Sequence, residues 1–114
     1  MLSIKETGIV LNIIVHCKRI EEKTNGLNEN QFVDDLDVQQ IVCFNIFQIG
    51  ELAKKLEASF IQQYDQVPWS SIKGMRDRIG HGYGTINLSQ VWKTVSQDIT
   101  PLREYCEEIL KNNQ

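Results

Sequence analysis

The densest group of chemically capable residues in this sequence is Arg76, Asp77, Arg78 and His81, in a stretch rich in glycine. An arginine binds phosphate through a planar fork and keeps its charge at any working pH. A histidine can accept and return a proton near neutral pH. Together they suffice for metal-free RNA cleavage, in which a base deprotonates the ribose 2′-OH, that oxygen attacks the neighbouring phosphorus, and a cation stabilises the developing charge.

The spacing of Arg76 and His81 sets a geometric condition on this chemistry. Side chains five residues apart on a continuous helix point about 140° away from each other. The two side chains therefore converge only if the helix breaks near Gly80, or if two copies of the chain meet across a two-fold axis. A structural alternative also stands, in which the arginine is a solvated helix residue and the histidine makes an ordinary hydrogen bond in a turn.

The composition predicts one globular domain without a strongly basic surface. The chain has 114 residues, of which 41% are hydrophobic and 24% charged, so residues 1–114 are expected to share a single core. The net charge is −3, whereas proteins that coat long nucleic acids usually carry a basic excess. Any contact with RNA must then be local, and the patch of Lys73, Arg76 and Arg78 against Asp77 could provide it.

The three cysteines, Cys17, Cys43 and Cys106, are far apart and form no C-x-x-C pair. They are predicted to be buried small residues rather than disulfide partners or metal ligands, and no metal or cofactor is expected. The apolar run from Ile9 to Val15 is too short to span a bilayer, and no signal-peptide cleavage site follows it. We therefore expect a cytoplasmic protein without membrane contact.

The apolar periodicity predicts helices along the whole chain and no sheet. The first helix carries a stripe from Ile9 to Ile20 and is expected to stop at Gly26. The second is expected to start within 30–37 and to continue to Phe60 as the central, most buried helix. A glycine costs about 1 kcal/mol inside a helix, so Gly50 is expected to permit the close approach of another helix.

A third, short helix is expected after Pro68, with Ser70 or Ser71 as its cap and the glycine-rich segment 80–84 as its end.

The last helix is expected to start at Asn87, which forms a capping-box pattern with Gln90, and to kink after Thr100 because of Pro101. Together these patterns predict an all-α, up-down bundle of four to five helices.

The window around Arg76 resembles the HepT-like toxins of the HEPN superfamily, which are helical ribonucleases. Their motif is an arginine, a polar residue, three to five further residues and a histidine; Arg76, Asp77 and His81 match it, and the HepT-like extension His-x-Tyr ends at Tyr83. Asp77 stands where the family often has asparagine, and Gly80 where a β-branched residue is common. Further similar segments are 49–56 in the second helix, 67–75 before the arginine, and 91–92 with 101–102 near the end.

This resemblance implies a HEPN-like bundle that forms a homodimer and acts as a metal-independent endoribonuclease toxin. It assigns His81 as the general acid and base, Arg76 as the phosphate clamp, and Asp77 as the residue that orients one of them. It also implies a partner nucleotidyltransferase antitoxin that transfers AMP to Tyr83. Each AMP would place phosphate charge two residues from the base, where the RNA phosphate must approach.

Lys73 and Arg78 are expected to guide RNA electrostatically. Two other functions stay open on the sequence alone. The chain could be a non-catalytic, nucleotide- or partner-binding subunit of a two-protein nucleotidyltransferase complex, or a helical interaction module with a vestigial motif. An arginine and a histidine that bind phosphate serve an enzyme and a binding subunit equally well.

Overall fold

The computed structural model describes residues 1–82 and 86–114, and these ranges contain helices and no strand. The all-α class predicted from the sequence is confirmed, with seven helices in the described ranges instead of four to five. The helices are α1 (Ile4–Thr24), α2 (Glu29–Val33), α3 (Leu36–Lys54), α4 (Ala58–Gln63), α5 (Trp69–His81), α6 (Leu88–Gln97) and α7 (Ile99–Asn112).

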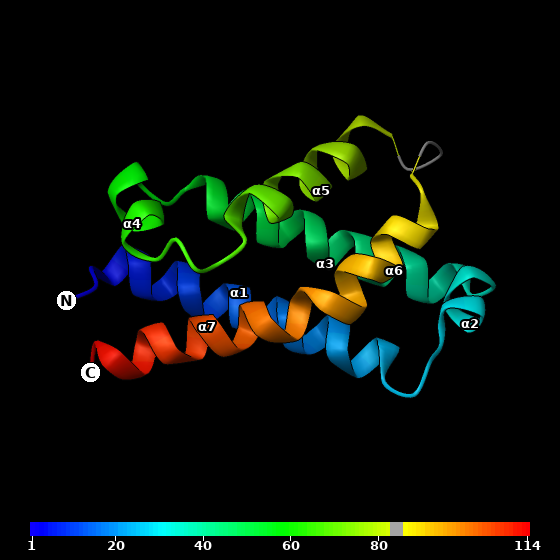
Figure 1. The fold of residues 1–114 in the computed structure, drawn as a ribbon, viewed down its shortest axis with the longest axis horizontal. Coiled ribbons are helices and arrows are strands. Elements are labelled where there is room, and N and C mark those ends of the chain that lie inside the picture. The colour runs from blue at the N-terminus through cyan, green and yellow to red at the C-terminus, as the bar shows by residue number, and fades with distance from the viewer. Residues whose placement is uncertain (83–85) are drawn as a thin grey trace.

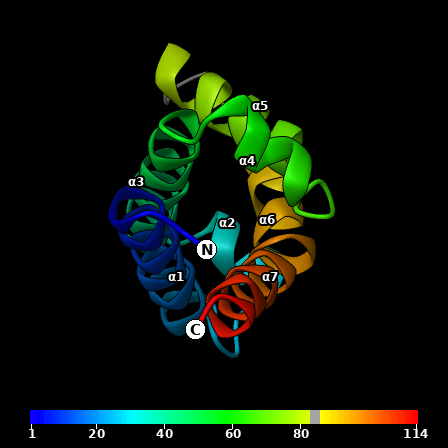
Figure 2. The same ribbon diagram turned by 90° about the vertical axis from the view of Figure 1, so that its left-hand side faces the viewer.

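The longer helices form an elongated bundle with extents of 44 × 28 × 20 Å. Helix α3 packs against α1 on one side and α5 on the other, and α1 also packs against α7. Both termini lie at the end of the bundle opposite α2 (Figure 1), and the view along the bundle shows the helices around one shared interior (Figure 2). None of the described helices is long and apolar enough to cross a membrane. Fully buried side chains of the core include Val10, Ile13, Ile46, Ile72 and Leu102.

The second helix expected from the sequence starts within the predicted range, at Leu36, but it is divided into α3 and α4, and the short helix α2 precedes it. Helix α2 ends at Val33, and Asp35 starts α3 by accepting a hydrogen bond from the backbone N–H of Val38 at 3.1 Å. A carboxylate at this position pairs one of the N–H groups that a helix leaves open at its start. Helix α3 ends at Lys54, and the predicted stripe resumes in α4, where Phe60 is buried.

The last helix is divided at Asp98, ahead of the predicted kink. Helix α6 ends at Gln97 and α7 begins at Ile99, so Pro101 lies in the first turn of α7. Proline is tolerated there because the N–H groups of a first turn have no helical partner. The expectation of a kink after Thr100 is therefore wrong in position. The predicted start at Asn87 is confirmed, and its side chain accepts a hydrogen bond from the backbone N–H of residue 90 at 3.2 Å.

Helix α5 starts before either serine that was expected to cap it. Pro68 is the N-cap residue and makes no side-chain cap hydrogen bond, so the predicted cap at Ser70 or Ser71 is wrong. The first residue of the helix, Trp69, is buried and donates its indole N–H to the carbonyl oxygen of Tyr64 at 2.9 Å. With Trp69 as its buried first residue, the helix starts two residues earlier than it would with Ser70 as its cap.

Helix α5 continues without a break through Gly80 to His81 and ends within the expected segment 80–84. The helix stops at Gly82, whose φ of 149° is a conformation that favours glycine. Because α5 is continuous from Arg76 to His81, both motif residues project from a single helix.

Gly50 lies at a close contact between α3 and α5. A Cβ atom at this position would overlap the Cβ and Cγ atoms of Arg76, which confirms the expected close approach. Gly8 in α1 provides a contrast, because a Cβ atom there would meet nothing within 4 Å.

Replacing Gly50 by alanine should lower the free energy of unfolding by about 1–3 kcal/mol, the usual cost of overpacking. Alanine is intrinsically better in a helix by about 1 kcal/mol, so the control substitution Gly8→Ala should be neutral or stabilising. Urea unfolding followed by far-UV circular dichroism measures both changes. Equal stabilisation by the two substitutions would contradict the close contact between α3 and α5.

Candidate functional site

Arg76 is held by three side chains on the side of α5 that faces α3. Its Nε–H donates to Glu51 Oε1 at 2.5 Å, and its Nη1 donates to Asp77 Oδ1 at 3.1 Å. Its Cζ atom lies 4.7 Å from the ring centroid of Phe47, a cation–π contact. The hydrogen bond to Glu51 raises the pKa of Arg76, so the guanidinium keeps its charge.

Because Gly80 has no side chain, there is room beside it for the guanidinium of Arg76. Gly80 lies one helical turn after the arginine, and a Cβ atom there would lie 3.4 Å from Arg76 Nη1 and 3.3 Å from Phe47 Cε2. A larger side chain would press on both groups. The glycine that departs from the family pattern therefore fits the way this chain packs its arginine against an aromatic ring.

Part of the Arg76 guanidinium is available to a ligand. The group carries five N–H donors, and the hydrogen bonds to Glu51 and Asp77 occupy Nε and one donor of Nη1. Within residues 1–82 and 86–114, Nη2 has no hydrogen-bond partner. The Arg76 side chain is 23% exposed, so the free N–H donors can reach an oxyanion such as a phosphate.

His81 lies apart from Arg76 in the same chain. It is exposed at the last position of α5 and lines a pocket of about 240 Å³ together with Arg78, Asn87 and Gln90. This pocket lies between the end of α5 and the start of α6, whereas Arg76 packs on α3. The structure therefore groups His81 with Arg78, and it does not bring the two motif residues together within one chain.

The remaining residues singled out in the sequence flank this region. Among the described residues, neither Lys73 nor Arg78 has an ion-pair partner, and both lie on α5. Arg78 also lines a neighbouring pocket of about 390 Å³ that contains Lys93 of α6. Tyr83, the residue expected to be modified, lies outside the described residues.

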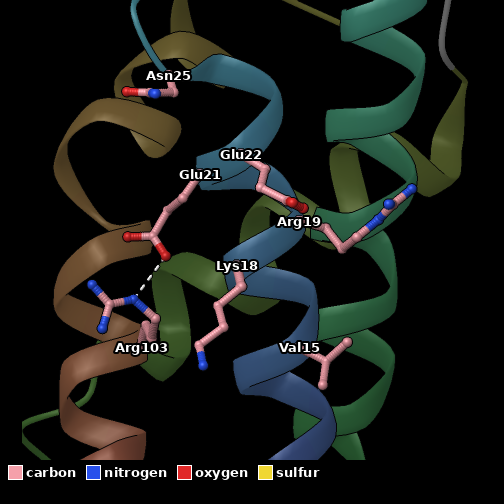
Figure 3. A pocket seen from close by; sticks show the side chains of 7 residues that line it. All are labelled: Val15, Lys18, Arg19, Glu21, Glu22, Asn25 and Arg103. Carbon is pink, nitrogen blue, oxygen red and sulfur yellow. Dashed lines mark hydrogen bonds and ion pairs between the residues drawn. The ribbon is translucent and has the colours of Figure 1, made fainter.

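A second charged cluster links α1 to α7 and has a structural role. Figure 3 shows the open groove of about 720 Å³ beside it, where Arg103 donates from Nε to Glu21 at 2.7 Å. Arg103 also donates to Glu107 at 2.6 Å, and Thr100 donates to Glu21 at 2.7 Å. Burial acts to raise the pKa of Glu21, but the hydrogen bonds from Arg103 and Thr100 bring it below the usual value. Because two carboxylates already bind this arginine, the cluster fastens two helices.

The other histidine and the three cysteines contribute to the fold rather than to the candidate site. His16 Nδ1 and the oxygen of buried Asn45 share a hydrogen bond of 2.8 Å between α1 and α3. All three cysteines are buried and free, as predicted. Burial raises the pKa of Cys43 to about 11 and that of Cys106 to about 12, so these thiols are poor nucleophiles.

Sequence reasoning did not identify Glu51 and Phe47 as partners of the arginine. They lie more than twenty residues before Arg76 on another helix, and no local spacing connects them to it. The available signal was Gly50, since a glycine inside a helix marks a place where another element comes close. The residue that follows this glycine is the one that binds the guanidinium.

The comparison with known proteins shows the family of this chain. Residues 13–109 match the family model described as Ribonuclease HepT-like, and no solved structure matches the chain. The chain is 30% identical over 103 residues to "Putative RNase TTE0752" of Caldanaerobacter subterraneus subsp. tengcongensis, covering 90% of this chain and 92% of that protein. It is 32% identical over 92 residues to "Probable ribonuclease HepT" of Thermococcus cleftensis, covering 81% and 84%. The matched span includes Arg76 with all its partners and His81, and the chain belongs to the Ribonuclease HepT-like family.

Proposed function

We propose that this chain is a metal-independent endoribonuclease toxin that acts as a homodimer, with Arg76 and His81 in its active site. The observation that carries the proposal is an arginine fixed at one edge by Glu51, with free N–H donors, on a helix that ends in an exposed histidine. The family match and the relatives named as ribonucleases support RNA as the substrate.

The continuity of α5 is the reason for a dimer. Residues 76 and 81 of one helix project about 140° apart, and the helix has no break between them. A second copy related by a two-fold axis can bring its own His81 beside Arg76. The active site is therefore incomplete without the partner, and each chain contributes one half of it.

In the proposed reaction, one His81 accepts the proton of the ribose 2′-OH. The 2′ oxygen forms a bond to the neighbouring phosphorus, and the bond from phosphorus to the 5′ oxygen breaks. The same His81 then returns that proton to the 5′ oxygen, which leaves a 2′,3′-cyclic phosphate and a 5′-OH. Arg76 stabilises the additional negative charge on the phosphoryl oxygens through its Nη donors, while Lys73 and Arg78 attract the RNA backbone.

We also propose that a nucleotidyltransferase antitoxin switches the enzyme off by transferring AMP to Tyr83. This tyrosine lies two residues after His81 in the sequence. A phosphate group attached there would repel the RNA phosphate and occupy space beside the base. Modification would then lower RNA binding and cleavage together.

A cleavage assay in EDTA tests this function. It compares the unmodified protein, the His81→Ala variant, and the protein co-expressed with its antitoxin. The expected result is cleavage by the unmodified protein alone. If none of the three cleaves RNA while nucleotide or RNA still binds, the chain is instead the binding subunit of a nucleotidyltransferase complex.

A further inference from the structure

We propose that Glu51 is a positioning residue for Arg76: it holds the guanidinium by Nε so that the Nη donors meet the RNA phosphate in one orientation. This inference rests on the proposed ribonuclease function, since the phosphate contact is what the positioning serves. Glu51 itself touches neither RNA nor the reacting atoms in this scheme.

The first argument is geometric. A guanidinium at the end of a long side chain has several rotamers, and three contacts remove this freedom here. The ring of Phe47 lies against the face of the group, Asp77 accepts a hydrogen bond from Nη1, and Glu51 accepts one from Nε. The position of Glu51 is itself set by Gly50, which lets α3 approach the stem of Arg76.

The second argument concerns charge. It distinguishes an effect of Glu51 on the orientation of Arg76 from an effect of its negative charge on RNA binding. Glu51 and Asp77 place two carboxylates on one arginine, so the local charge opposes RNA binding. If Glu51 acted only through its charge, removing it would improve both RNA binding and cleavage. If Glu51 positions the arginine, removing it leaves RNA binding unchanged or stronger and slows the chemical step.

The third argument concerns exposure. The side chain of Glu51 is 38% exposed, and ion pairs this accessible contribute little to stability. Its second cationic neighbour, Lys54, lies 3.9 Å away on the next turn. Glu51 can therefore be replaced in the folded protein, and Lys54→Ala is a matched control that removes the other contact of the same carboxylate.

The test compares Glu51→Ala, Glu51→Gln and Lys54→Ala with the wild-type chain. The first readout is the ¹H–¹⁵N signal of the Arg76 Nε–H, assigned by its loss in Arg76→Lys and observed for slow exchange with water. The second is the kcat for metal-free RNA cleavage, measured together with RNA affinity. A gel-filtration profile and a melting curve for each variant report whether the protein remains folded.

We expect Glu51→Ala to abolish the slow exchange of the Nε–H and to lower kcat by about tenfold or more, because small displacements of a catalytic group are costly. RNA affinity should stay equal or rise at low salt. Glu51→Gln should keep both the signal and most of kcat, because its amide oxygen also accepts the Nε–H. Lys54→Ala should change neither readout.

Two results would overturn the inference: a protected Nε–H signal in Glu51→Ala, or a wild-type kcat in that variant. A loss of kcat in folded Glu51→Gln equal to that in Glu51→Ala would overturn it too, because an acceptor for the Arg76 Nε–H would then not be what sustains kcat. If the wild-type chain cleaves no RNA, the proposed function fails. The Nε–H signal then still decides whether Glu51 holds Arg76.

Discussion

Replacing His81 by alanine should lower the rate of metal-free RNA cleavage by about 10²–10⁴-fold, the usual contribution of a general acid or base. The fold should persist, because His81 is exposed at the end of α5 and buries no surface in the core. RNA binding should also persist, since the arginine and lysine side chains that contact phosphate are unchanged. Single-turnover cleavage of a labelled RNA in EDTA, with binding measured in parallel, tests this expectation.

His16→Ala is the matched control, because His16 is the second of the two histidines in the chain. It shares a hydrogen bond with buried Asn45, so its removal leaves that amide oxygen without this partner. The variant should lose about 1–3 kcal/mol of stability and should keep the cleavage rate per folded molecule. A wild-type rate in His81→Ala would remove His81 from the mechanism.

Replacing Arg76 by alanine should lower the cleavage rate by about 10²–10³-fold, the typical cost of removing a donor that stabilises transition-state charge. A strain that expresses this variant without the antitoxin should grow, whereas the wild-type chain should arrest growth. Arg76→Lys keeps the charge, but it loses the planar fork and the Nε–H that binds Glu51. It should therefore also be strongly impaired.

Arg78→Ala is the control for Arg76, since Arg78 lies on the same helix and has no ion-pair partner among the described residues. When a phosphate contact only guides RNA, its loss weakens RNA binding uniformly across sequences and reduces the salt dependence of binding. Arg78→Ala should thus change affinity and leave the chemical step nearly intact. Persistent toxicity of Arg76→Ala, or equal effects of the two variants on kcat, would contradict the role of Arg76.

The helical stripes were predictable from the sequence, but the divisions between helices were only partly so. Apolar spacing located α1, with Ile9 to Ile20 buried along one face. It also placed the start of the next long helix within 30–37, where α3 begins at Leu36. It could not show that this helix ends at Lys54 or that Asp98 separates α6 from α7, because the apolar stripe continues across both divisions.

The candidate site was predictable by residue type and not by arrangement. Arg76 and His81 stood out because of their types and spacing. The sequence placed the end of α5 within 80–84, which is confirmed, but it left open whether the helix breaks between Arg76 and His81. The partners Glu51 and Phe47 come from a distant part of the chain, and only the folded structure brings them to the arginine.

The most direct test of the shared active site mixes two inactive variants. Arg76→Ala and His81→Ala chains are combined under conditions that exchange subunits, heterodimers are counted by native mass spectrometry, and RNA cleavage is measured in EDTA. A heterodimer keeps an intact Arg76 on one chain and an intact His81 on the other. The account predicts recovery to about a quarter of the wild-type rate, because half of the dimers regain half of their sites. A mixture that contains heterodimers and stays as inactive as its parents would contradict a site formed by two chains.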